Sequence, residues 1–310
     1  MFKAKKALIL CLRLALVYVA MLMAYILGTM VIGQDGTVLS PQETDQAGKA
    51  LLLVSLASAL VLSFLILRSR YHGLKLVGVT FFVHFGVETF MTQIETLYFN
   101  SAVQMEASML VGIVAAGALR ALVFAPLAVL ILGKMKRPAQ PQTDRTTVTE
   151  WGKRFIALSL LYAVIYFLFG YFVAWQWQET RLYYTGTTSI KPFFTHFRDL
   201  FVREDPAIIP FQLLRGTLWA CLSTTIAQTM KAKRWQVALA VASTFAVHIA
   251  LPLGLFPNPY MPPAVAQSHF YETASSMLLY GAIAGWVLYE RNEYHIARVG
   301  TRKEAQEWTS

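Results

Sequence analysis

Long apolar stretches constrain the fold of this chain more than any other feature of its sequence. A helix that crosses a bilayer needs roughly 20 mostly apolar residues, and about eight stretches approach that length. They lie near 8–32, 50–67, 71–91, 108–133, 155–176, 207–229, 235–255 and 270–289. Backbone groups in lipid must bond within their own segment, so these stretches are expected to be helices. The sequence predicts an all-α integral membrane protein with about eight transmembrane helices.

The composition fits this class, and the charge distribution argues against a nucleic-acid partner. Apolar residues make up 56% of the 310 positions and charged residues only 14%, yet the net charge is +10. Twenty of the 27 Lys and Arg residues fall in the segments expected on one side of the membrane: the N-terminal tail, 68–75, 134–154, 231–234 and the C-terminal tail. The positive-inside rule makes that side cytoplasmic. We therefore predict a multi-pass protein of the cell membrane with both termini in the cytoplasm.

Two segments recur in the two halves of the sequence. The residues TFFVH at 80–84 return as TFAVH at 244–248, and Ser-Met-Leu at 108–110 returns at 276–278. The matches keep their order and their place within the predicted spans, which indicates an internal repeat. We predict two four-helix repeats at 1–137 and 154–294, joined by a cytoplasmic linker at 138–153 and followed by a tail at 295–310. Because four is an even number, both repeats would enter the membrane in the same direction.

The repeated histidines, His84 and His248, mark a candidate polar centre. Each follows an arginine at the inner end of its span by fourteen residues. Both rings are therefore expected about 21 Å from the inner edge of a hydrocarbon core about 30 Å thick. Glu88 follows His84 by four residues and shares its helix face, and His269 and Glu272 stand three apart at the start of the last span. Because ionisable groups in spans usually face the bundle interior, a shared site is predicted in the outer half of the bilayer.

Two arginines within predicted spans add positive charge to this region. Arg120 lies halfway along the fourth span, and Arg215 lies in the outer half of the sixth. An arginine at mid-bilayer costs at least ~2.5 kcal/mol on insertion scales, so each should be paired or hydrated. They are expected either to bind an anion or lipid headgroup or to form structural ion pairs between helices. The candidate binding residues are therefore His84, Glu88, His248, Glu272, Arg120 and Arg215.

Several chemical roles suit these residues. Imidazole and carboxylate groups bind divalent metals such as zinc or iron, and the candidate metal ligands are His84, His248, Glu88 and Glu272. The same groups suit a proton- or ion-coupled relay in a transporter. Two histidines at one depth also suit axial ligation of haem. The fourth interpretation is structural, because buried histidines can hydrogen-bond across helices and fix their register. No spacing in the sequence decides among the four.

The long polar and aromatic segment at 177–206 is expected to form an outer loop. Within it, aromatic and aliphatic side chains follow helical spacing at Phe193, Phe194, Phe197, Leu200 and Phe201. This pattern predicts an amphipathic helix in the outer membrane interface.

The functional interpretation that we place first is a transporter or permease-like protein, with its polar centre in the outer half of the bilayer. The alternatives are a membrane-embedded metal-dependent enzyme that acts on a lipid or isoprenoid, and a non-catalytic assembly or anchoring protein. The expected partners are the lipid bilayer and a small-molecule or lipid substrate. Cys11 and Cys221 both fall in predicted spans, so neither a disulfide framework nor a thiolate metal site is expected.

Overall fold

The computed structural model describes residues 2–31, 40–136 and 148–289. The predicted C-terminal tail at 295–310 and most of the predicted linker lie outside the described residues. Every regular element in these ranges is a helix, and the only pairing of strand type there is an isolated bridge between Ser69 and Met230. The all-α class is therefore confirmed.

Eight long helical segments cover the eight apolar stretches of the sequence. They are α1 (Phe2–Thr29), α2 (Pro41–Leu67), a rod made of α3 (Gly73–Phe85), η1 (Gly86–Phe90) and α4 (Met91–Tyr98), α6 (Ala107–Ile131), α7 (Val148–Phe172), α10 (Ile208–Thr229), α11 (Arg234–Leu255) and α12 (Pro263–Val287). Six of them, namely α1, α2, the rod, α6, α7 and α11, are long and apolar enough to cross a membrane. By length and composition, the chain is a multi-pass membrane protein.

The helices α10 and α12 are as long as the other six but more polar. Among the buried side chains of α10 are Gln212 and Arg215, and among those of α12 is Glu272. All three residues take part in the hydrogen-bonded polar groups described below. These polar groups of the two helices are thus turned inward, toward the interior of the bundle.

Local sequence signals fix where α2 begins. Pro41 occupies the first turn, where its missing N–H costs nothing. The hydroxyl of Ser40 accepts from the backbone N–H of Glu43 at 3.2 Å, and the Glu43 carboxylate accepts from the backbone N–H of Ser40 at 2.9 Å. This capping box starts the helix nine residues before the apolar stretch, so its first turns are polar and exposed.

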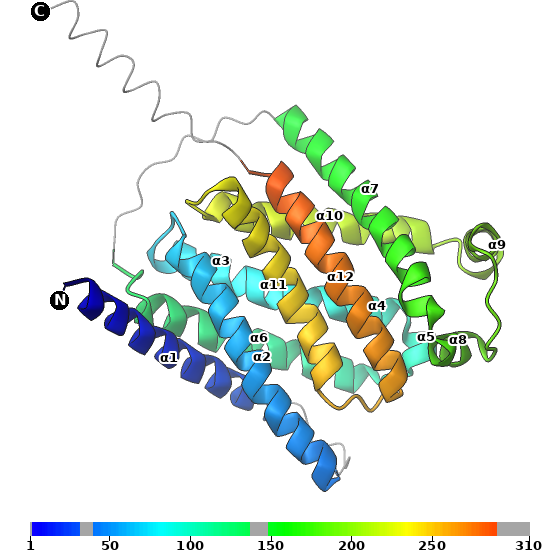
Figure 1. Ribbon diagram of the computed structural model, residues 1–310, viewed down its shortest axis with the longest axis horizontal. Coiled ribbons are helices and arrows are strands. Elements are labelled where there is room, and N and C mark those ends of the chain that lie inside the picture. The colour runs from blue at the N-terminus through cyan, green and yellow to red at the C-terminus, as the bar shows by residue number, and fades with distance from the viewer. Residues whose placement is uncertain (1, 32–39, 137–147, 290–310) are drawn as a thin grey trace, which may run out of the picture.

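In Figure 1, α2, α7, α11 and α12 run in a similar direction, and α6, α10 and the rod cross behind them. In the first half, α1 packs against α2 and α6, and α6 packs against α3; in the second half, α7 packs against α10 and α12, and α12 packs against α11. Between the halves, α2 contacts α11 and α3 contacts α10. The helices α11 and α12 approach each other closely, because a Cβ at Gly281 would lie 2.6 Å from the Cα of Ala242.

Short helices gather at the end of the bundle opposite the start of α1 (Figure 1). They are α5 (Asn100–Val103), η2 (Ala174–Gln176), α8 (Gln178–Thr185), α9 (Phe193–Asp199) and η3 (Leu200–Glu204). The helix predicted near 193–201 is confirmed. Its aromatic stripe packs against α7, where Phe197 and Phe201 both contact Phe167 edge to face, whereas Phe194 is strongly exposed.

Candidate functional site

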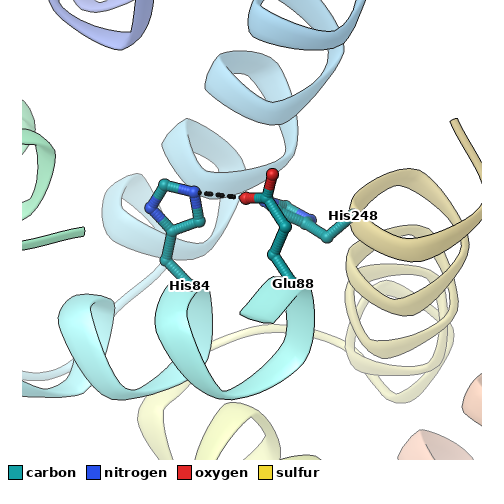
Figure 2. A group of neighbouring side chains, drawn as sticks. All are labelled: His84, Glu88 and His248. Carbon is teal, nitrogen blue, oxygen red and sulfur yellow. Dashed lines mark hydrogen bonds and ion pairs between the residues drawn. The ribbon is translucent and has the colours of Figure 1, made fainter. Parts of the chain in front are cut away.

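Three ionisable side chains from distant parts of the sequence converge inside the bundle. His84 and Glu88 come from the α3–η1 rod and His248 from α11 (Figure 2). Nε2 of His84 lies 2.8 Å from Oε2 of Glu88, and the two imidazole rings have centroids 5.4 Å apart. One ligand atom from each residue lies within 4.8 Å of the others, and none of the three residues is more than 8% exposed. The structure therefore brings the repeated histidines together, as the repeat predicts.

The rod that carries His84 and Glu88 changes its winding between them. The segment Gly86–Phe90 is a π-helical turn, in which the backbone N–H of Met91 bonds to the carbonyl of Gly86. Such turns are rare and occur frequently at functional sites. A Cβ at Gly86 would lie 2.8 Å from a methyl group of Leu222, so glycine at this position lets α10 approach the rod closely.

The tautomer of His248 follows from its hydrogen bond. Its Nδ1 lies 2.9 Å from the backbone carbonyl of Thr244, which can only accept, so Nδ1 carries the hydrogen. In the neutral imidazole, Nε2 therefore presents a lone pair. This buried atom has no hydrogen-bond partner within the described ranges. The unused lone pair therefore belongs to a ring whose centroid lies 5.4 Å from that of His84.

The second carboxylate oxygen of Glu88 is held from the opposite direction. Tyr25 donates its hydroxyl to Oε1 at 2.5 Å, and Nη2 of Arg120 lies 3.3 Å from the same oxygen. Arg120 also donates to the Thr89 hydroxyl at 3.4 Å, and its guanidinium lies 4.3 Å from the centroid of the Tyr25 ring. Arg120 therefore has the partner that an arginine within a span requires. Both Oε1 contacts leave Oε2 facing the histidines.

Arg215 and Glu95 form a second polar group. The guanidinium donates to both oxygens of Glu95, at 2.6 and 2.5 Å, and to the side-chain oxygen of Gln212 at 3.1 Å. Glu95 lies beyond the apolar stretch predicted at 71–91, whereas the rod continues as helix through Tyr98. The sequence does hold an indication of Glu95: it stands seven residues after Glu88, a spacing that places two side chains on one side of a helix.

Glu272, the remaining candidate, is not in the His84 group. Its Oε2 accepts from Nδ1 of His269 at 2.9 Å, as the spacing of three residues predicts. Nε2 of His269 in turn lies 3.1 Å from the hydroxyl of Tyr184 on α8. The six candidates therefore do not form one centre. The structure groups four of them, places Arg215 with Glu95, and places Glu272 with His269; sequence reasoning did not identify Tyr25, which contacts Glu88.

No known protein family, curated protein or solved structure matches this chain. The fold and the site nevertheless define a class: a helical, multi-pass membrane protein with a buried cluster of two histidines and a carboxylate.

Proposed function

We propose that this protein is a membrane-embedded, metal-dependent enzyme whose metal ion is bound by His84, Glu88 and His248. The observation that carries the proposal is the unpartnered Nε2 of His248. A buried polar atom without a partner costs about 1–3 kcal/mol. The hydrogen bond of Nδ1 to Thr244 leaves this lone pair free in a ring that belongs to the His84–Glu88–His248 group, and a bound ion would use it.

The composition of the ligand set favours a catalytic ion. Two imidazole nitrogens and one carboxylate oxygen are the set found in His₂Glu zinc sites and in iron sites with open positions. Structural zinc sites use four protein ligands, whereas three ligands leave a position for substrate or water. The carboxylate also favours a metal ion over bis-histidine haem, which needs only two axial ligands. An ion here would polarise a carbonyl or phosphoryl group of the substrate.

The surrounding contacts support the same interpretation. Metal ligands are usually oriented by hydrogen bonds from neighbouring groups. Tyr25 and Arg120 hold one oxygen of Glu88 and leave the other available, while the Thr244 carbonyl orients His248. Binding of the ion would replace the hydrogen bond between His84 and Glu88.

The position of the centre inside an apolar bundle favours a membrane-soluble substrate, such as a lipid or an isoprenoid. We further propose that α10 and α12 also cross the bilayer, giving eight spans in a cell membrane with both termini cytoplasmic. The helix pairing supports two parallel repeats, because α1, α2, α3 and α6 contact one another in the same pattern as α7, α10, α11 and α12. The contacts of α2 with α11 and of α3 with α10 suit a pseudo-two-fold axis that passes near the two histidines.

Metal analysis of the purified protein tests the proposal. Wild-type protein loaded with zinc or ferrous iron and then desalted should retain about one ion per chain. His248→Ala should lose it, while His196→Ala, which removes a histidine on α9, should retain it. Retention of the ion by His248→Ala, or wild-type protein that binds neither metal, would contradict the proposed site.

A proton-coupled transporter is the second candidate function, and one observation favours it. Tyr25, Glu88 and His84 already form a continuous hydrogen-bonded chain, with Arg120 paired to the carboxylate. Such a chain suits proton movement coupled to a conformational change. In proteoliposomes containing a pH-sensitive dye, a transporter of this kind should acidify the lumen, and Glu88→Gln should abolish the signal. Equal signals from both proteins would exclude this relay.

A further inference from the structure

Among the buried N–H groups on α10 that lack an acceptor within the part of the chain that the structure describes, two belong to side chains that contact each other. They are Nε2 of Gln212, whose residue is 0% exposed, and Nε of Arg215, whose residue is 3% exposed. Buried donors are nearly always hydrogen-bonded in folded proteins. Both side chains already meet at the contact between Arg215 and the Gln212 oxygen, so their unused donors belong to one region. They indicate a ligand that carries hydrogen-bond acceptors.

The charges around these donors restrict the kind of ligand. The charge of Arg215 is compensated by its two hydrogen bonds to Glu95. A purely anionic ligand would therefore meet an ion pair with no net charge. A zwitterionic ligand brings its own cation and can pair with both charges.

The two ends of this polar group differ in their exposure to solvent. The side chain of Arg215 is 3% exposed, whereas that of Glu95 is 35% exposed, so the donors lie deep and the carboxylate lies nearer the surface. The rings of Tyr162, Tyr166 and Phe211 lie 5.7 to 5.8 Å from the guanidinium and form aromatic walls. These aromatic faces are already occupied by the Arg215 cation. Because the two unused donors lie deep and Glu95 lies nearer the surface, the anionic part of a ligand fits inside and its cationic part fits beside Glu95.

We propose that Gln212, Arg215 and Glu95 bind a zwitterionic headgroup, in which a phosphate accepts from Gln212 and Arg215 and an amino group binds Glu95. The ligand is either a phospholipid headgroup or a free molecule with the same two charges. The site lies outside the His84–Glu88–His248 group, and its test is independent of metal binding.

Lipid binding measured by native mass spectrometry tests this site. The probes are dihexanoylphosphatidylethanolamine, which is zwitterionic, and dihexanoylphosphatidylglycerol, which is anionic. Wild-type protein should bind the ethanolamine lipid about 10-fold more tightly than the glycerol lipid, and Gln212→Leu should lose about 10-fold in affinity for the former, as removal of one hydrogen bond to a charged group predicts. Ser223→Ala, which removes a buried hydroxyl that bonds within α10, is the matched control and should bind like wild type.

The substitution Glu95→Gln provides a second test, which can be used even if Gln212→Leu folds poorly. Removing the carboxylate leaves Arg215 uncompensated, so the preference should reverse toward the anionic lipid. Binding of glycerophosphoethanolamine as tight as the lipid identifies a free zwitterion, and weaker binding identifies the lipid; both support the proposed chemistry. The proposal is overturned if wild-type protein does not distinguish the two lipids, or if Gln212→Leu binds both as wild type does.

Discussion

Removing Glu95 should destabilise the protein more than removing Arg215, although both substitutions break the same ion pair. Loss of one partner of a buried pair costs about 3–5 kcal/mol, because the other charge stays buried and unpaired. In Glu95→Gln the uncompensated group is Arg215, which is 3% exposed. The glutamine oxygen still accepts one hydrogen bond, so we expect the lower end of this range, about 3 kcal/mol.

The opposite substitution leaves a charge that water can reach. In Arg215→Met the remaining group is Glu95, whose side chain is 35% exposed and can turn toward solvent, while methionine fills the vacated volume. The expected cost is about 1 kcal/mol, as for a partly exposed pair. With about 2 °C of melting temperature per kcal/mol for a chain of this size, Glu95→Gln should lower the Tm by roughly 6 °C and Arg215→Met by about 2 °C.

Thermal unfolding followed by circular dichroism in detergent measures both variants. Lys49→Ala is the control, because it breaks the exposed pair of Lys49 with Asp45, which should contribute little. Equal losses for Glu95→Gln and Arg215→Met, or a larger loss for the latter, would refute the reasoning from burial.

Three further predictions concern the proposed metal site, the short helix α9 and the topology. Tyr25→Phe removes the hydroxyl that orients Glu88, so metal affinity measured by chelator competition should fall about 10- to 100-fold while the fold is retained. Burial lowers the pKa of His196, so its stabilising contribution is present above the ordinary value near 6.5 and is lost as the pH falls below it. The protection of α9 amides, measured as the exchange rate relative to the intrinsic rate at each pH, should therefore fall below about pH 6 in wild type but less in His196→Gln. Single cysteines at Lys5 and at Glu290, just past α12, should both react with an impermeant reagent from the cytoplasmic side only; labelling from opposite sides would contradict an even number of spans.

The helices and the histidine pair were predictable from the sequence because they depend on local periodicity and on a repeat. The two TF-x-VH segments predict equal positions for His84 and His248 in two helices, and the two rings do lie together, with centroids 5.4 Å apart. The spacing of four residues likewise predicts the contact between His84 and Glu88. These inferences need no knowledge of how one helix is rotated against another.

The remaining contacts depend on that rotation. Tyr25 reaches Glu88 because α1 packs against α2 and α6 beside the rod, and no spacing within α1 marks this contact. Glu272 was predicted to lie with the histidines because of its depth in the membrane. In the structure it accepts a hydrogen bond from His269, whose other ring nitrogen lies beside the hydroxyl of Tyr184 on α8. Glu95 lies outside the apolar stretch predicted at 71–91; the helix nevertheless continues there, with Arg215 as the partner of the carboxylate.

X-ray absorption spectroscopy of the metal-loaded protein tests the proposed centre most directly. It should show nitrogen and oxygen ligands at about 2.0–2.2 Å, with the outer-shell scattering of two imidazole rings in wild type and of one ring in His248→Ala. A spectrum containing sulfur ligands, or one that does not change in His248→Ala, would contradict binding of the ion by His84, Glu88 and His248.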